Sequence, residues 1–122
     1  MRCLRSFILL GIFAVPLCTS SIAYFIDIIP KTEHDTYCMD VNETVTFQAQ
    51  GFQKDEVTGE VASSDLGKVW WDFHKGLFSK ISSNTHTITL KAIKPGGSTL
   101  TAVGMVKDQS YTKTITIIVN GV

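Results

Sequence analysis

The chain has 122 residues with 11 basic and 11 acidic side chains, so its formal net charge is zero. This size fits one small domain with a single core. Both arginines lie in the first 23 residues, so the remaining 99 carry nine lysines, eleven acidic residues and a formal charge of −2. A nucleic-acid binder needs a basic stripe, usually with arginine. We therefore expect no nucleic-acid partner.

The N-terminal segment, residues 1–23, resembles a secretory signal peptide. Arg2 and Arg5 precede an apolar stretch at 7–17, and the small-x-small sequence "SIA" at 21–23 is typical of a cleavage site. The apolar stretch is shorter than the roughly twenty residues that a membrane-spanning helix needs. An uncleaved anchor is the alternative interpretation.

Cleavage is expected between Ala23 and Tyr24, which leaves one domain at 24–122 without stable membrane insertion. The segment predicts a secreted, periplasmic or cell-surface location. Cys18 is an alternative lipid-anchor site, although the small residue that should precede it is missing. Cys38 would be the single cysteine of the processed chain, so no internal disulfide is expected. We expect Cys38 to be buried, with a bond to another chain as the alternative.

Alternation of apolar and polar residues dominates the rest of the chain and predicts β-strands. Six stretches show it, at 26–28, 44–50, 69–73, 87–92, 99–103 and 114–119. The acidic, glycine-containing segment 51–67 is expected to be a long loop with a short edge strand at 60–62. The pattern predicts an all-β, two-sheet antiparallel sandwich of about seven strands.

Three segments resemble bacterial immunoglobulin-like domains of surface and adhesion proteins. They are "VNETVTFQAQG" (41–51), "TITLKAIKPGGSTLTAVG" (87–104) and "TKTITIIV" (112–119). Asn42 stands where that family usually has glycine, which asparagine can replace because it tolerates a left-handed backbone. "WWDFHKG" (70–76) partly resembles the signature of polycystic-kidney-disease-type repeats. Both resemblances imply an immunoglobulin-like β-sandwich.

Catalytic and metal-binding chemistry is not indicated. No nucleophile, phosphate-binding or Cys-x-x-Cys motif occurs, so we expect no enzyme activity and no cofactor. His34, His74 and His86 lack metal-ligand spacing, and His86 is expected at the rim of the core. Four acidic residues in segment 51–67 leave calcium open as an alternative to a solvated loop. They are Asp55, Glu56, Glu60 and Asp65.

The resemblance therefore implies an exported, non-catalytic module that binds a protein or glycan partner at the cell envelope or surface. The alternative is a structural subunit that associates with its own copies or joins an envelope complex. A protease-inhibitor module of the chagasin-like type is a weaker alternative. Its inhibitory loops have no counterpart in the sequence, so that function does not carry over.

The adjacent tryptophans of "VWWDF" (69–73) must point to opposite faces of a strand. Trp71 shares its parity with Val69 and Phe73 and is predicted to face the core. Trp70 is then predicted to face outward, within a partner-binding surface on a largely threonine-covered sheet. The predicted members of that surface are Trp70, Val103, Met105 and Ile118. Alternatively, a loop or the N-terminal segment around Tyr24 and Phe25 covers Trp70.

Overall fold

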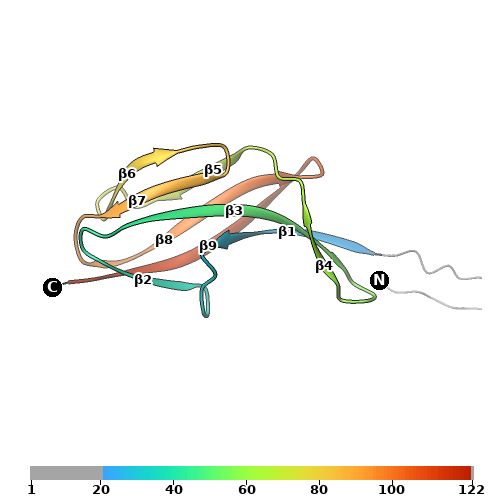
Figure 1. Ribbon diagram of the computed structural model, residues 1–122, viewed down its shortest axis with the longest axis horizontal. Helices are drawn as coiled ribbons and strands as arrows, with labels where there is room; N and C mark the ends of the chain where they lie inside the picture. Colours follow the sequence, from blue (N-terminus) through green and yellow to red (C-terminus); the bar gives the residue numbers. More distant parts are fainter. Residues whose placement is uncertain (1–20, 122) are drawn as a thin grey trace, which may run out of the picture.

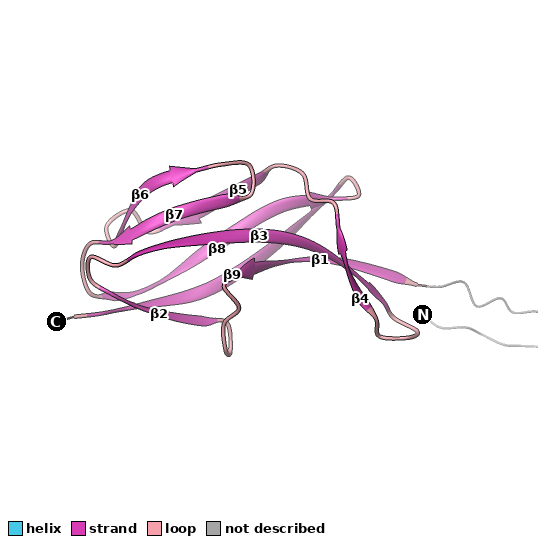
Figure 2. Ribbon diagram, in the orientation of Figure 1, coloured by secondary structure: helices cyan, strands magenta, loops and turns pink. Residues whose placement is uncertain are grey.

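The computed structural model describes residues 21–121. These residues form nine strands, joined by turns and loops, and no helix (Figure 2). Within that range no helix has the length and apolarity needed to cross a membrane. The predicted signal peptide lies almost entirely outside the described residues, so its removal stays a prediction.

The first sheet places four strands side by side in the order β1, β3, β7, β6 (Figure 1). Their bounds are Ile22–Ile29 for β1, Thr44–Asp55 for β3, Thr87–Ala92 for β7 and Phe78–Ser83 for β6. A short strand, β4 (Val61–Ser64), pairs with the last part of β3. All pairings in this sheet are antiparallel.

The second sheet has the order β2, β9, β8, β5. These strands span Thr36–Asp40, Gln109–Asn120, Gly96–Val106 and Val69–Phe73 respectively. β2 pairs with β9 in parallel, so the expectation of a purely antiparallel sandwich was wrong at this edge. The cause is that the chain leaves β1 in the first sheet and crosses at 30–35 to the second sheet without reversing into a hairpin.

The strand count also exceeds the predicted seven, because β2 and β6 were not expected. Both are short edge strands, with five and six residues. In β6 only Phe78 is buried and the other five residues are exposed, so no alternation marks the strand. In segment 51–67 the short edge strand expected at 60–62 is present as β4, shifted to Val61–Ser64, whereas the first part of the segment, expected to be a loop, continues β3 to Asp55.

The core lies between the two sheets and follows the predicted parity closely. In β7 the buried positions alternate strictly with half-buried ones. β8 and β9 present their apolar positions to the same interior. The largest fully buried side chains include Phe47, Phe78, Ile28, Ile88, Leu90, Leu100, Ile115 and Ile117. Burial of this apolar surface is the main contribution to the stability of the fold.

Several turns have a left-handed backbone, and two of them bear on the predicted fold and on strand register. Asn42 has a φ of 74°, which confirms the conformation expected where asparagine replaces glycine. Lys107 and Asp108, with φ values of 50° and 66°, form the two-residue turn between β8 and β9. Positive φ at both central residues is the geometry of a type I′ hairpin, and it sets the register of that strand pair.

β5 and β6 are the terminal strands of their sheets on the same side of the sandwich, at the top of Figure 1. They belong to different sheets and are not paired with each other. The amide of Val69 in β5 donates to Thr85 O, just beyond β6, at 3.2 Å. The two edge strands therefore lie close together with a gap in the hydrogen-bonded surface between them.

Candidate functional site: the β5 edge and its outer face

The paired tryptophans of β5 point to opposite faces, as predicted. Trp71 packs against the core, together with buried Val69. Trp70 faces outward and has 54% of its surface exposed. Trp71 is only half-buried, because β5 is an edge strand and no other strand of residues 21–121 pairs with its free side.

The indole of Trp71 retains one unsatisfied group. Its Nε1 is buried and has no hydrogen-bond acceptor among the described residues. A buried donor without a partner destabilises a fold by about 1 to 3 kcal/mol. The apolar packing of Trp71 must therefore more than offset this cost.

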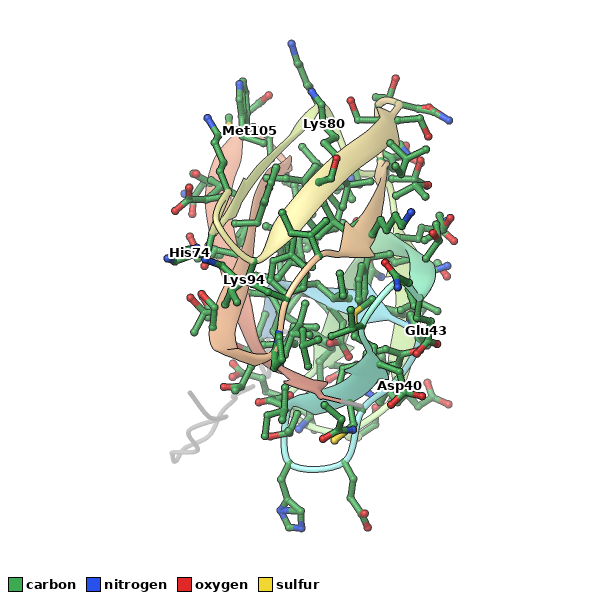
Figure 3. The ribbon with its side chains drawn as sticks, turned by 90° about the vertical axis from the view of Figure 1, so that its left-hand side faces the viewer. Asp40, Glu43, His74, Lys80, Lys94 and Met105 are labelled. Atoms are coloured by element: carbon green, nitrogen blue, oxygen red, sulfur yellow. The ribbon has the colours of Figure 1, made fainter. Side chains whose placement is uncertain are left out.

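Trp70 lies directly beside Val103, its register partner on β8. Met105 is two residues further along β8 and therefore faces the same side. Lys68 Nζ lies 5.8 Å from the centre of the Trp70 ring, within the range of a cation–π contact. We call the group of Trp70, Val103 and Met105 the Trp70 patch; Met105 is visible in the upper part of Figure 3.

Ile118, the fourth predicted member, does not join the Trp70 patch. It is 40% exposed on the same face, but its register partner on β8 is Gly97. Gly97 is six residues from Val103 along the strand, a separation of about 20 Å. The structure therefore brings together three of the four predicted partner-binding residues and places the fourth at the other end of the sheet.

Cys38 lies beside Ile118 and is exposed, so the expectation that it is buried was wrong. The adjacent Met39 is only 2% exposed and occupies the inward position of β2. Because neighbouring side chains of a strand face opposite sides, Cys38 must face outward.

The alternative in which the N-terminal segment covers Trp70 does not match the arrangement of the described residues. Tyr24 packs against the core from β1. The Phe25 ring stacks on Phe52 of β3, with ring centroids 5.3 Å apart. Both aromatic residues are thus engaged in or beside the first sheet, and Trp70 remains exposed.

Ala23 and Tyr24, the residues on either side of the predicted cleavage bond, lie inside β1. They pair with Lys54 and Gln53 of β3. Cleavage between them would remove the first two residues of β1, and this position of the cleavage bond stays a prediction.

A cleft of about 610 Å³ opens between β5 and β6, directly beside the Trp70 patch. We call it the β5–β6 cleft. Its apolar wall includes Trp70, Trp71 and Phe73 of β5. Three lysines also line it, and no acidic residue does; they are Lys68, Lys75 and Lys80.

Neither a protein-family model nor a curated protein matches the sequence. Among solved structures the chain is similar to domains 4 and 5 of the S-layer protein SbsC, with a TM-score of 0.50 and 14% identity over 86% of this chain. This chain spans 57% of the length of that domain pair.

Two further solved structures are similar at lower TM-scores. A chimeric titin Z1Z2 functionalised with a decorin peptide has a TM-score of 0.47, with 10% identity over 85% of this chain and 99% of that one. The BIgI domain of β protein from S. agalactiae, bound to CEACAM1, has a TM-score of 0.45, with 17% identity over 82% and 99%.

The strand orders decide the architecture. The order β1-β3-β7-β6 reproduces the ABED sheet of a constant-type immunoglobulin domain, and β5-β8-β9 reproduces its CFG sheet. The fold is immunoglobulin-like. In this immunoglobulin-like sandwich the β5–β6 cleft lies between the edge strands that correspond to C and D, and β2 extends the CFG sheet beyond G.

Other polar residues singled out in the sequence have structural roles in the sandwich. His86 Nε2 lies 2.8 Å from Leu66 O, at the rim of the core as expected. His74 Nδ1 accepts a hydrogen bond from the Gly76 amide just after β5 ends. Asp55 Oδ1 accepts bonds from two amides of the following turn, at 2.9 and 3.3 Å. The described residues contain no group of three or more potential metal ligands.

The lysines of the β5–β6 cleft were not recognised as site residues from the sequence. Lys68 and Lys75 flank the "VWWDFH" segment, so a basic residue on each side of an aromatic strand was a visible signal. Lys80 carried no such signal, because β6 was not predicted and its position beside β5 depends on the packing of the two sheets.

Proposed function

We propose that the chain is an exported, non-catalytic immunoglobulin-like module that binds a protein or glycan partner at the cell envelope or surface through the Trp70 patch. The main support is Trp70 itself, a large aromatic residue with 54% of its surface exposed on a sheet face otherwise rich in threonine. Tryptophan and methionine are enriched in the buried centres of protein interfaces. The N-terminal sequence supports export.

Cross-linking in the native host, comparing the unaltered chain with Trp70→Ser, tests this proposal. We expect one foreign adduct with the unaltered chain and a marked loss of it with Trp70→Ser. Ile118→Ser is a matched control, because Ile118 is exposed on the same face about 20 Å away. Equal adduct yields from all three chains would contradict the proposal.

A ladder of self-adducts would favour the assembling subunit instead. Reproducible hydrolytic turnover, abolished by one point mutation, would contradict a binding role altogether. Mass spectrometry of the protein from the native host tests export separately, because an intact Met1 would contradict removal of the signal peptide.

A further inference from the structure

The hydrogen-bonding direction of each residue in β5 follows from the β8–β9 hairpin. A two-residue turn is closed by a pair that exchanges both hydrogen bonds, here Val106 with Gln109. Bonding alternates along β8, so Val103 and the residue two before it point their backbone groups toward β5. Their partners there are Trp70 and Asp72.

The backbone groups of Trp71 and Phe73 therefore point away from β8, toward the β5–β6 cleft. The amide of Val69, which has the same parity, confirms this direction because it donates to Thr85 O. No described strand pairs with this edge of β5. The free donors and acceptors of this edge are those of Trp71 and Phe73, two residues and about 7 Å apart, which is the repeat of an extended peptide.

β6 forms the opposite wall and also has a free edge. Leu77 O, just before β6, accepts a hydrogen bond from the Ile93 amide beyond β7. By alternation Ser79 bonds toward β7, so the backbone of Lys80 points away from it. Lys80 lies on the same upper side of the sandwich as Met105 (Figure 3).

The charge of the cleft is uncompensated. Lys68, Lys75 and Lys80 line it without a carboxylate. The ion pairs among the described residues use only Lys31 and Lys113. Since the domain as a whole has more acidic than basic residues, this local positive excess selects an acidic ligand.

We propose that the β5–β6 cleft binds an extended acidic segment of a partner polypeptide, which pairs with the free edge of β5 as an added strand. This inference rests on the proposed binding function and specifies its partner. Backbone bonding at the edge supplies affinity, and the lysines and aromatic wall select the side chains. The same lysines oppose pairing between two copies, because like charges would meet at the joined edges.

An extended peptide accounts for the site better than an acidic glycan does. A glycan can stack on Trp70 and contact the lysines, but its hydroxyl groups do not repeat with the spacing of the free backbone groups of β5. Donors and acceptors at that edge are complementary to another β-strand.

Selection from a phage-displayed library of random twelve-residue peptides, followed by titration of the purified domain, tests the proposal. We expect enriched peptides to contain carboxylates at alternate positions. Their addition should shift the amide NMR signals of Trp71, Phe73 and Lys80 more than those of Trp70 and Asp72. The double variant Lys75→Glu/Lys80→Glu should weaken binding about tenfold or more, whereas Lys54→Glu, outside the cleft, should change it little.

A matched pair at Phe73 isolates the backbone contribution. Phe73→Ala removes the ring but keeps the amide N–H, whereas Phe73→Pro removes both. Proline is tolerated on an edge strand when its nitrogen faces outward, so both variants should fold, as circular dichroism can confirm. We expect Phe73→Pro to bind the selected peptides about tenfold more weakly than Phe73→Ala does.

Enriched peptides without carboxylates, equal binding by the two Phe73 variants, or binding of heparin fragments at the cleft with no peptide selected would each overturn the inference. None of these outcomes contradicts the proposed function. If the peptide test fails but Trp70→Ser still loses the native adduct, the chain is a binding module that does not bind by strand addition.

Discussion

At the scale of single residues, the informative contrast is between Trp70 and Trp71. They are adjacent in sequence and similar in chemistry, yet one has 54% of its surface exposed and the other packs against the core. The difference arises from strand geometry alone, since neighbouring side chains alternate between faces. Their substitutions should therefore have separable effects on stability and association.

We predict that Trp70→Ser changes the free energy of unfolding by less than about 0.5 kcal/mol, as is usual for surface substitutions. Trp71→Ser should cost about 3 kcal/mol, because it removes a large aromatic side chain that packs against the core. Urea unfolding followed by circular dichroism measures both. Equal destabilisation by the two substitutions would show that Trp70 is also a packing residue.

At the scale of the strands, β3 pairs with β1 from Gln48 to Asp55 on one side, and with β7 and then β4 on the other. Gly51 marks the region where β3 lies between β1 and β4. A Cβ atom at Gly51 would lie 2.9 Å from Ser64 O, a backbone atom that cannot move without displacing β4. The close approach of β4 thus depends on the missing side chain.

Gly51→Ala should destabilise the domain by about 1 to 3 kcal/mol, the usual cost of overpacking an interior position. The control is Gly97→Ala, since a Cβ atom there would have no neighbour within 4 Å. Thermal or urea unfolding of both variants provides the comparison. A Gly51→Ala variant as stable as the Gly97→Ala control would mean that β4 adjusts without cost.

The same strands show how far the sequence predicts the fold. Alternation in "TITLKA" correctly identified β7 and its buried residues. This strand is paired with β3 on one side and with β6 on the other, and its inner face is fully covered. β2 and β6 have a pairing partner on only one side and are short, so their patterns are weak. The error at Cys38 follows from this, since an unrecognised strand has no predictable parity.

The candidate site was predictable only in part for a similar reason. Parity places Trp70, Val103 and Met105 on one face, but it does not give distances along the strands. Those depend on the register of the β8–β9 hairpin, which the two-residue turn at Lys107 and Asp108 sets. This register places Ile118 far from Trp70.

At the scale of the whole molecule, three charged residues connect segments that are distant in sequence. Lys113 Nζ of β9 lies 3.8 Å from Asp27 Oδ1 of β1 and 2.9 Å from Asp35 Oδ1, just before β2. Asp27 Oδ2 also accepts a hydrogen bond from Lys31 Nζ at 2.8 Å. Partial burial raises the pKa of Asp27, but bonds from Lys31 and the Ile28 amide and the two lysine charges together hold it below its ordinary value of 3.8.

A carboxyl group with a lowered pKa in the folded state stabilises the fold above its unfolded pKa and loses that contribution as the pH falls through its folded pKa. We therefore predict that Asp27→Asn lowers the thermal unfolding midpoint at pH 6. The difference in unfolding midpoint between Asp27→Asn and the unaltered chain should shrink as the pH falls below about 4. Scanning calorimetry between pH 2 and pH 6 measures it.

Asp72→Asn is the control for this pH dependence, because Asp72 has no ion pair among the described residues. If the unfolding midpoints of Asp27→Asn and the unaltered chain differed by the same amount down to pH 2, the ionised Asp27 carboxylate would not be the source of the stabilisation.

The parallel pairing of β2 with β9 determines how the domain bears mechanical load. The described ends of the chain lie at opposite ends of the long axis (Figure 1). Tension between them pulls β2 and β9 in opposite directions along their length, across the register from Thr36–Thr116 to Asp40–Asn120. All the hydrogen bonds of that pair are then sheared together, whereas an antiparallel hairpin pulled from its two ends opens one bond at a time. The amide of Val41 donates to Asn120 O at 3.2 Å, whereas the amide of Asp40 donates to Glu43 Oε1, so alternate residues face β9 and Cys38 faces away from it. A single-molecule stretching experiment should find that Val41→Pro lowers the unfolding force and that Cys38→Pro, which removes no bond to β9, lowers it less.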